Sequence, residues 1–160
     1  MHTPTVETPR LTLRLKSPAE VLAWVESLPP EVRAEVSPDW VERARHAPPG
    51  DVWALGFTVL ERATGAEVGG CAFKGPPDAD GVVEVAYGVD EPHQRQGYAT
   101  ELTEALVAVA FERGVRVVRA HAKADNAASL RVLAKCGFRT LGWVIDPEDG
   151  EVLRFERAAG

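Results

Sequence analysis

The sequence predicts an α+β fold with one mixed sheet of about seven strands and helices on both faces. Segments with the alternation of strands and segments with helical spacing are interspersed along the whole chain. They follow the order strand, two helices, hairpin, strand, helix, strand, helix and two strands. No repeat, low-complexity stretch or linker divides the 160 residues, so we expect a single domain over residues 1–160.

The first part of the chain begins with a half-exposed strand over residues 8–15, in which leucines alternate with polar residues. Ser17 before a proline is typical of a helix start, and it predicts a short helix over residues 19–28. A second helix is expected over residues 31–46, with a break near the Ser-Pro pair at 37–38.

A β-hairpin follows, with strands predicted over residues 53–60 and 67–74. The pair Gly69-Gly70 inside the second strand indicates close packing or a β-bulge. After a glycine- and proline-rich loop, residues 82–89 form a β-rich strand that ends at the acidic segment beginning with Asp90.

The last part alternates helices and strands. A helix starts near Ala99, has apolar residues at helical spacing and ends at Gly114. The remaining predicted elements are a strand over 115–122, a helix over 127–136 and two strands over 138–144 and 152–156.

The composition excludes several classes of function. A net charge of −6 and a pI near 5.3 disfavour nucleic acid as a partner, because phosphate binding needs clustered cations. They are compatible with a cationic or amine substrate. There is no apolar run long enough for a signal peptide or a membrane span, and the two cysteines, Cys71 and Cys136, suit buried free thiols. We therefore expect a cytoplasmic protein without a metal site.

The stretch from Val82 to Thr100 carries the first functional signal. A strand, a polar loop and the first turn of a helix follow one another, and backbone N–H groups at such a helix start can hold a phosphate. Gly97 lets the chain approach a ligand closely, Ala99 is also small, and Arg95 adds a cation.

Two motifs in this chain resemble those of the GNAT superfamily of N-acetyltransferases. The first, Gln94-x-x-Gly97-x-Ala99, is similar to the acyl-CoA-binding motif of that family. The second, from Asn126 to Phe138, is similar to its Asn-x-x-Ala/Ser…Lys-x-Gly-Phe segment. The opening Thr-Pro-Arg-Leu-x-Leu-Arg also resembles the branch of ribosomal-protein N-terminal acetyltransferases, the RimJ/RimL type. The likeness covers nearly the whole chain.

The resemblance implies a mostly antiparallel GNAT-like sheet in which two adjacent parallel strands, 82–89 and 115–122, splay apart and hold CoA. Backbone groups near Tyr87, Gly88 and Val89 would pair with pantetheine, and the N–H of Val89 would polarise the thioester carbonyl. The expected cofactor-binding residues are Tyr87, Gly88, Val89, Gln94, Arg95, Gln96, Gly97, Tyr98, Ala99, Thr100, Asn126 and Ser129.

Glu84 and Ser129 are the candidate catalytic residues. Glu84 is the one ionisable side chain in an apolar strand, which suits a general base, and the alternative is a solvent-facing strand position. Many family members place a tyrosine, the acid for the leaving thiolate, where this chain has Leu133. Ser129 is therefore a candidate acid, and its alternative is a hydroxyl that hydrogen-bonds the helix or the pantetheine arm.

Other side chains have plainer interpretations. His121 suits a packed or solvated position in its strand better than an acid–base role, and His93 suits an exposed loop position better than a phosphate contact. Lys135 suits a solvated position, with the adenosine end of the cofactor as the alternative. Trp24 and Trp40 suit the core or the wall of an acceptor pocket.

The sequence thus predicts an acetyl-CoA-dependent N-acetyltransferase acting on a primary amine, first of all a protein or peptide N-terminus. A small amine, such as an amino acid, polyamine or aminoglycoside, is the alternative acceptor. A non-catalytic CoA-binding module is the alternative class, and the absence of Lys-Ser/Thr after the glycine loop counts against a P-loop protein. Homodimers are common in the family, and the sequence does not decide the oligomeric state.

Overall fold

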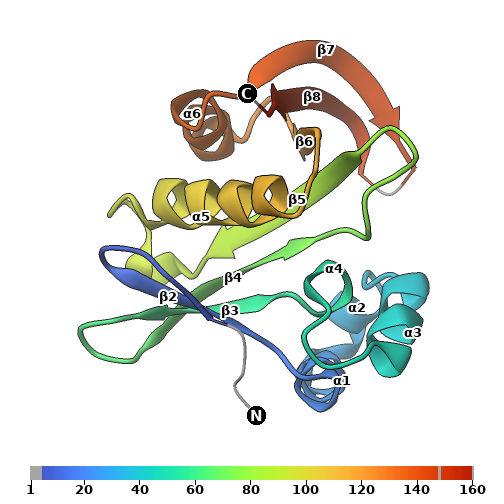
Figure 1. The fold of residues 1–160 in the computed structure, drawn as a ribbon, viewed down its shortest axis with the longest axis vertical. Helices are drawn as coiled ribbons and strands as arrows, with labels where there is room; N and C mark the ends of the chain where they lie inside the picture. Colours follow the sequence, from blue (N-terminus) through green and yellow to red (C-terminus); the bar gives the residue numbers. More distant parts are fainter. Residues whose placement is uncertain (1–4, 148, 160) are drawn as a thin grey trace.

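The computed structural model of the chain describes residues 5–147 and 149–159. In this part of the chain, eight strands form one mixed sheet in the order β1-β2-β3-β4-β5-β6-β8-β7 (Figure 1). Every neighbouring pair is antiparallel except β5 and β6, which are parallel. The strands are Thr5–Glu7 (β1), Leu11–Leu15 (β2), Phe57–Glu61 (β3), Glu67–Phe73 (β4), Val82–Val89 (β5), Val117–Ala122 (β6), Arg139–Asp146 (β7) and Gly150–Ala158 (β8).

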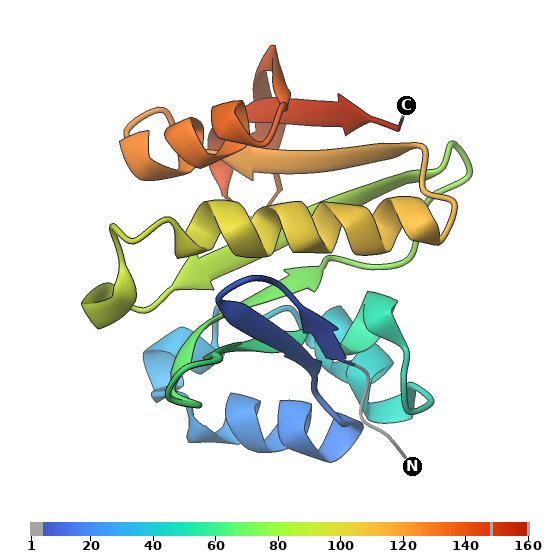
Figure 2. The same cartoon turned by 60° about the vertical axis from the view of Figure 1, so that its left-hand side comes forward.

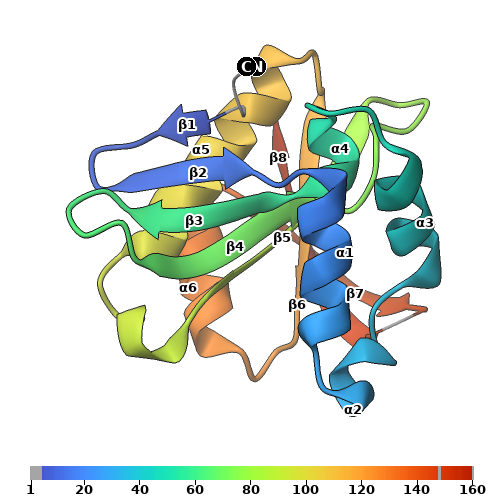
Figure 3. The ribbon, with the colours of Figure 1, turned by 90° about the horizontal axis from the view of Figure 1, so that it is seen from below.

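Helices cover both faces of the sheet, which confirms the predicted fold class. Figure 3 shows α5 and α6 behind the strands and α1 in front of them, and Figure 2 shows α5 running along the sheet beside β5. The helices are Pro18–Ser27 (α1), Pro30–Arg33 (α2), Pro38–His46 (α3), Val52–Leu55 (α4), Tyr98–Glu112 (α5) and Ala127–Lys135 (α6), with a 3-10 turn, η1, at Glu91–His93.

The core lies between the sheet and α5. The alternating leucines of β2 are all at most 1% exposed, because every second strand residue faces the same side. Helix α5 presents Leu102, Leu106 and Val109 at helical spacing, and each is buried. This packing holds the start of α5 against the ends of the central strands, where the candidate site lies.

Local sequence signals fix several element boundaries as predicted. Ser17 caps α1 in a capping box with Glu20, each side chain bonding the backbone N–H of the other residue. Gly114 follows α5 with a φ of +85°, the left-handed conformation that glycine adopts easily. Of the close packing or β-bulge expected at Gly69-Gly70, close packing is present, because a Cβ at Gly69 would lie 2.2 Å from the Gly88 carbonyl oxygen. The register of β4 shifts just before the pair, where Val59 faces Gly69 but Leu60 faces Glu67.

Two predictions about the strands need correction. Residues 53–60 do not form one strand, because residues 52–55 form the short helix α4 and β3 starts at Phe57. The Asp51 side chain accepts a hydrogen bond from the Trp53 N–H, and Gly56 ends the turn with a φ of +74°. A short first strand, β1, was not predicted; it pairs with β2, so the sheet of the described residues has eight strands instead of about seven.

Candidate functional site

Strands β5 and β6 part at the centre of the sheet. Over the described chain they pair at only three positions, Val82↔Val117, Val83↔Val118 and Glu84↔Arg119. Beyond Glu84, β5 continues to pair with β4, while β6 continues to pair with β8. The two parallel strands therefore form a fork that opens after Glu84, as expected for a splayed pair.

The register shows which backbone groups face this fork. The Glu84 carbonyl accepts a hydrogen bond from the N–H of Lys74, the residue after β4, and Asp90 donates to Val68 in β4 itself. The direction of the backbone N–H and C=O groups alternates along a strand. Those of the even-numbered residues of β5 therefore face β4, whereas those of Tyr87 and Val89 face the fork. By the same alternation the backbone N–H and C=O of Gly88 face β4, contrary to the expectation that they would pair with pantetheine.

The loop after β5 turns sharply before α5. The Gln94 side chain donates to the Val89 carbonyl at 2.8 Å, which ties the loop to the end of the strand. Arg95 and Gly97 both have positive φ, +66° and +83°. Helix α5 then begins at Tyr98, and the N–H groups of its first turn have no carbonyl within the helix to bind.

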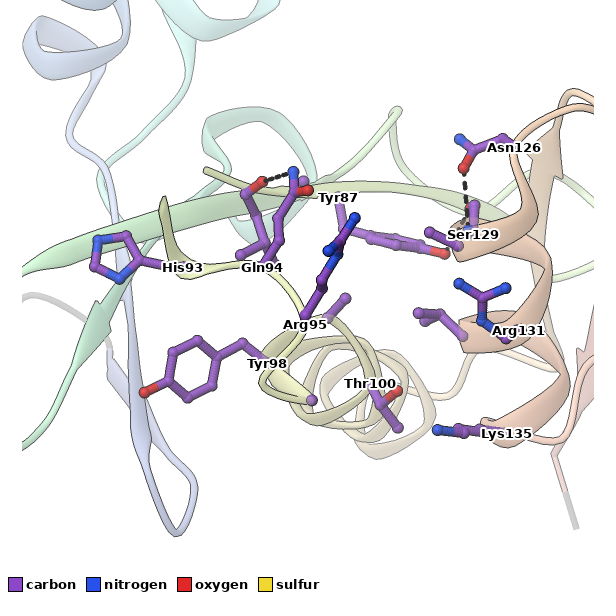
Figure 4. Close-up of a pocket in the computed structure, with 16 residues that line it drawn as sticks. Tyr87, His93, Gln94, Arg95, Tyr98, Thr100, Asn126, Ser129, Arg131 and Lys135 are labelled. Atoms are coloured by element: carbon purple, nitrogen blue, oxygen red, sulfur yellow. Dashed lines mark hydrogen bonds between the residues drawn. The ribbon is translucent and has the colours of Figure 1, made fainter. Parts of the chain in front are cut away.

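A cavity of about 610 Å³ lies where this loop, the fork and α6 meet (Figure 4). Of the twelve expected cofactor-binding residues, all but Gln96 line it. The complete lining consists of Tyr87, Gly88, Val89, His93, Gln94, Arg95, Gly97, Tyr98, Ala99, Thr100, Asn126, Ala128, Ser129, Arg131, Val132 and Lys135.

Several cationic side chains stand along one end of the cavity. Figure 4 shows Arg95 beside the start of α5, with Arg131 and Lys135 on the facing side of α6. Arginine and lysine side chains together with free helix-start amides are the donors that phosphate groups prefer. The residues present therefore fit the phosphate-bearing end of CoA.

Sequence reasoning missed Arg131 and gave Lys135 and His93 plainer roles, yet all three line the cavity. A signal for two of them was present. Ala128, Arg131 and Lys135 follow one another at intervals of three and four residues, so they share one face of α6. His93 has no such signal, because the 3-10 turn that places it is not visible as a periodic pattern.

Two hydroxyl groups meet in the middle of the cavity. The Tyr87 phenol and the Ser129 hydroxyl are 2.9 Å apart, and Asn126 holds the start of α6 by accepting a hydrogen bond from the Ser129 N–H at 3.1 Å. Burial raises the pKa of Tyr87 above its usual value, so the phenol stays protonated at neutral pH. Leu133 is fully buried in the core.

Glu84 lies at the last paired position of the fork. Its Oε2 accepts from Lys74 Nζ at 3.1 Å and is 2.9 Å from Nδ1 of His121, whose side chain is only 6% exposed. Nε of Arg154 donates to Nε2 of His121 at 3.1 Å. Since that contact makes Nε2 the acceptor, the proton of a neutral His121 resides on Nδ1 and is donated to Glu84.

The side chains of Glu84 and Tyr87 lie on opposite faces of the sheet, because the two residues are three positions apart in one strand. Glu84 does not line the larger cavity. It lines a smaller one of about 200 Å³, together with Lys74 and Arg119. The fork thus separates the large cavity on one side from a carboxylate on the other.

Lys74, the ion-pair partner of Glu84, has further interactions of its own. Arg43 of α3 donates to the Lys74 carbonyl at 3.2 Å. Burial lowers the pKa of Lys74, but the carboxylates of Glu84, of Asp149 in the β7–β8 turn and of Asp146 at the end of β7 outweigh burial and raise it overall. Lys74 therefore connects Glu84 to α3 through its backbone and is influenced by the carboxylates at the β7–β8 end of the sheet through its charge.

The tryptophans of the helical region divide between core and surface. Trp40 donates its indole N–H to the Ala54 carbonyl at 2.8 Å, while Trp24, edge-on to it, is 45% exposed.

Both cysteines are buried free thiols, as predicted. In the described part of the chain, no helix combines the length and the apolar character that a membrane crossing requires.

Comparison with known proteins gives a consistent family. The model of the acetyltransferase (GNAT) domain matches residues 2–139. The protein YjdG of Bacillus subtilis (strain 168), an uncharacterized N-acetyltransferase, is 36% identical over 72 residues, which are 44% of this chain and 43% of that protein. The match thus spans less than half of the length of this curated relative.

Solved structures share the fold over almost the whole chain. RimL, a ribosomal L7/L12 α-N-protein acetyltransferase solved in complex with coenzyme A, has a TM-score of 0.72 and 20% identity, covering 97% of this chain and 98% of that one. An acetyltransferase from Salmonella typhimurium that modifies the N-terminal serine of ribosomal protein L7/L12 has a TM-score of 0.72 and 18% identity, covering 98% and 100%.

Proposed function

The chain belongs to the GNAT family of acetyltransferases, and we propose that it transfers an acetyl group from acetyl-CoA to a primary amine. One observation carries this proposal. A strand fork lies between a cavity lined by helix-start amides and cations on one side and a carboxylate, Glu84, on the other. Such an arrangement lets a donor and an acceptor approach the same point from opposite faces of the sheet.

The donor end of the site is built to hold phosphate. The amides at the start of α5 would bind the diphosphate, with Arg95 beside them, while Arg131 and Lys135 of α6 would neutralise the remaining phosphate charge. Bound there, acetyl-CoA supplies the acetyl group in activated form, as a thioester. The chain's own backbone groups at Tyr87 and Val89 would align the pantetheine arm along β5.

The N–H of Val89 is the proposed donor to the acyl oxygen. It faces the fork, and the carbonyl of the same residue is already occupied by the Gln94 side chain. A fixed N–H at this point would stabilise negative charge as it develops on that oxygen. This role is the one proposed from the sequence, and the register of β5 supports it.

Glu84 is the proposed general base, acting directly or through a water molecule. Lys74 and His121 both contact Oε2, and no hydrogen bond between described residues engages Oε1. A carboxylate held at one oxygen and accessible at the other can accept a proton from an ammonium group arriving on that face. The side chain is 22% exposed, which leaves room for that approach.

The proton for the leaving thiolate would come from the hydroxyl pair of Ser129 and Tyr87. Their 2.9 Å contact lets one hydroxyl donate while the other replaces the proton. The protonated phenol of Tyr87 is a suitable source at neutral pH. This pair would do the work that a tyrosine at the position of Leu133 does in many members of the family.

A peptide or protein N-terminus is the acceptor we propose first. Large apolar side chains stand exposed on the surface, Trp24 and Val32 in the helical region and Trp143 and Ile145 on β7. An open surface of this kind suits the residues that follow an N-terminal amine better than it suits an enclosed small molecule. The structures of similar fold named as ribosomal-protein N-terminal acetyltransferases support the same choice.

A non-catalytic CoA-binding module is the second candidate. The ion pair between Lys74 and Glu84 favours it, because a carboxylate already paired with a lysine also suits a purely structural role. A small amine as acceptor stays the alternative within the enzymatic proposal.

The decisive experiment offers the protein acetyl-CoA with a panel of acceptors and measures free thiol and acetylated product. The panel contains short peptides with free N-termini and small amines, namely amino acids, polyamines and aminoglycosides. The blocked controls are the same peptides with an acetylated N-terminus and an internal lysine. We expect thiol release with the free N-termini and none with the blocked controls.

Acetylation of small amines alone would contradict the peptide acceptor and leave acetyl transfer intact. If calorimetry shows CoA binding and the whole panel stays unmodified, the binding-module candidate replaces the enzyme. A chain that neither binds CoA nor transfers acetyl groups would contradict the proposal as a whole.

A further inference from the structure

We infer that the turn between β1 and β2 sets the geometry of the loop before α5, and that Arg10 is a positioning residue for the diphosphate of the donor. The inference rests on the proposed function, because it concerns how CoA is held. Arg10 does not line the cavity, so its effect would be exerted through the loop and not by contact with the ligand. The Thr8-Pro9-Arg10 segment, which precedes β2, would then contribute to cofactor binding.

One side chain joins the turn to three consecutive parts of the site. Arg10 Nη1 donates to the carbonyl of Gln96, 86 positions away in the sequence, at 2.7 Å. Its Nε donates to Oε1 of Glu101 in the first turn of α5 at 2.8 Å. The guanidinium also lies over the ring of Tyr98, 4.6 Å from its centre. Arg10 thus contacts the loop just before Gly97 and the helix just after it.

Glu101 fixes Arg10 in return. The backbone N–H of Arg10 donates to Oε2 of Glu101 at 2.8 Å, and the Thr8 hydroxyl bonds the same oxygen. Burial raises the pKa of Glu101, but the hydrogen bonds from Thr8 and Arg10 outweigh burial and lower it overall. The carboxylate is therefore charged at neutral pH and holds both the side chain and the backbone of the turn.

Peptide geometry links these contacts to the cavity. In a trans peptide the carbonyl and the following N–H point in opposite directions, and the described chain has no cis peptide bond. When Arg10 holds the Gln96 carbonyl, the Gly97 N–H is directed away from Arg10, and Gly97 lines the cavity. The contact between Arg10 and the Gln96 carbonyl thereby sets the direction of the Gly97 N–H on the cavity side of the loop.

Gly97 packs directly on the arginine. A Cβ at this position would lie 3.2 Å from Nη2 of Arg10, and the φ of +83° already disfavours side chains. The absence of a side chain at Gly97 is therefore needed on the Arg10 side as well as for access of a ligand. The carbonyl of Gly97 accepts from the Glu101 N–H at 3.1 Å, so both flanking peptides of this residue are held.

A second hairpin strengthens the same end of the sheet. Arg62, just after β3, donates its N–H to the Arg10 carbonyl at 2.9 Å and its Nη1 to the Thr8 carbonyl at 2.8 Å. The Tyr98 hydroxyl bonds Glu61, the last residue of β3. The turn that carries Arg10 is thus a rigid support and not a free loop.

The test compares Arg10→Met with Arg14→Met. Both arginines belong to the same segment, but Arg14 pairs with Glu20 of α1 at 3.0 Å, away from the cavity. CoA affinity is measured by calorimetry, and the Gly97 amide is followed by NMR during titration with inorganic diphosphate. We expect Arg10→Met to weaken CoA binding about tenfold, the contribution of one hydrogen bond to a charged group. The diphosphate-dependent shift of the Gly97 amide should also be lost.

The control variant should bind CoA within about twofold of the wild type, since exposed ion pairs contribute little. Arg10→Lys, which keeps a cation able to reach the Gln96 carbonyl, should recover part of the affinity. Wild-type affinity and an unchanged Gly97 shift in Arg10→Met would overturn the inference while leaving the proposed function standing. A wild-type protein that does not bind CoA would overturn both.

If Arg10→Met does not fold, Glu101→Gln provides the same test from the other side. That change keeps the size of the side chain and removes the charge that holds Arg10. CoA binding weaker by several-fold is expected. An unchanged affinity in this folded variant would count against the inference as directly as it would for Arg10→Met.

Discussion

Glu84 occupies the one position of β5 that is still paired with β6 and already adjacent to the fork. Strand alternation places its side chain on the face away from the large cavity. Lys74 and His121 then fix one of its oxygens, so the carboxylate has a defined direction as well as a defined place.

Replacing Glu84 with Gln should lower turnover about 100-fold or more, the effect usual for the loss of a general base. The side chain keeps its size, so CoA affinity should stay nearly unchanged. The measurement is the pH dependence of kcat with saturating acetyl-CoA, beside calorimetry of CoA. A profile identical to that of the wild type would remove Glu84 from the mechanism.

His121 offers a sharper test of how the carboxylate is positioned. His121→Asn keeps an N–H donor where Nδ1 stands, whereas His121→Leu keeps the bulk and loses the donor. We expect Leu to lower kcat about tenfold and Asn to restore most of it, because one charge-assisted hydrogen bond separates the two. Equal rates for the two variants would mean that the contact does not serve the reaction.

The contact between His121 and Glu84 marks the limit of prediction at this scale. Glu84 could be chosen from the sequence, since a lone carboxylate in an apolar strand is visible locally. His121 was interpreted as a packed or solvated residue because its partner lies 37 positions away. The pairing depends on the parallel register of β5 and β6, which the sequence does not encode in any short segment.

Among the elements, the loop and helix start from Asp90 to Thr100 were the most predictable. A strand, glycine and an apolar helix with 3.6-residue spacing are local signals, and the structure follows them. The error at residues 53–60 has the opposite cause. An apolar run suits a buried strand as well as a turn of helix, and the side-chain cap from Asp51 decides between them.

Gly97→Ala is the corresponding test of the loop. A methyl group there would be strained by the positive φ and would lie 3.2 Å from the Arg10 guanidinium. Strain of this kind costs about 1 kcal/mol or more, so CoA affinity should fall by at least about fivefold. Calorimetry checks this, with Gly65→Ala, which also has positive φ but open surroundings in the β3–β4 turn, as the control for backbone strain alone.

Weaker CoA binding in both glycine variants would indicate a general loss of stability. Weaker binding in Gly97→Ala alone would assign the effect to the loop. Unchanged affinity in Gly97→Ala would contradict the assignment of this loop to the phosphates.

At the scale of the whole molecule, the fold class followed from the sequence, and the adjacent parallel pair of β5 and β6 followed from the resemblance to the GNAT family. The short strand β1 did not, because its three residues are too few to show a period. The pairing of β6 with β8 instead of β7 also had no local signal, since it places the last strand of the chain inside the sheet.

Acid should destabilise the molecule through a small set of carboxylates. Hydrogen bonds lower the pKa of Glu20 in the capping box of α1 and, against the effect of burial, that of Glu101 beside Arg10, from an ordinary value of 4.5. Groups with a lowered folded-state pKa stabilise the protein above that ordinary value, and the contribution is lost as the pH falls through the folded-state pKa. We expect the free energy of unfolding in urea to decrease below about pH 4.5.

Glu101→Gln should flatten part of that decrease, because the variant has no proton to take up at this position. Urea unfolding at a series of pH values from neutral to strongly acidic checks both statements. A wild-type stability that stays constant through this range, or a decrease of the same size in the variant, would contradict the assignment.

The fork between β5 and β6 also changes where the backbone is shielded from solvent. In most sheets the central strands contain the amides that exchange most slowly with deuterium, and edges exchange first. Here, in the part of the chain that the structure describes, the amides of Tyr87 and Val89 sit midway across eight strands yet face no paired strand. The interior of this sheet should therefore exchange as an edge does, and a pantetheine chain lying along β5 would slow exchange there before anywhere else.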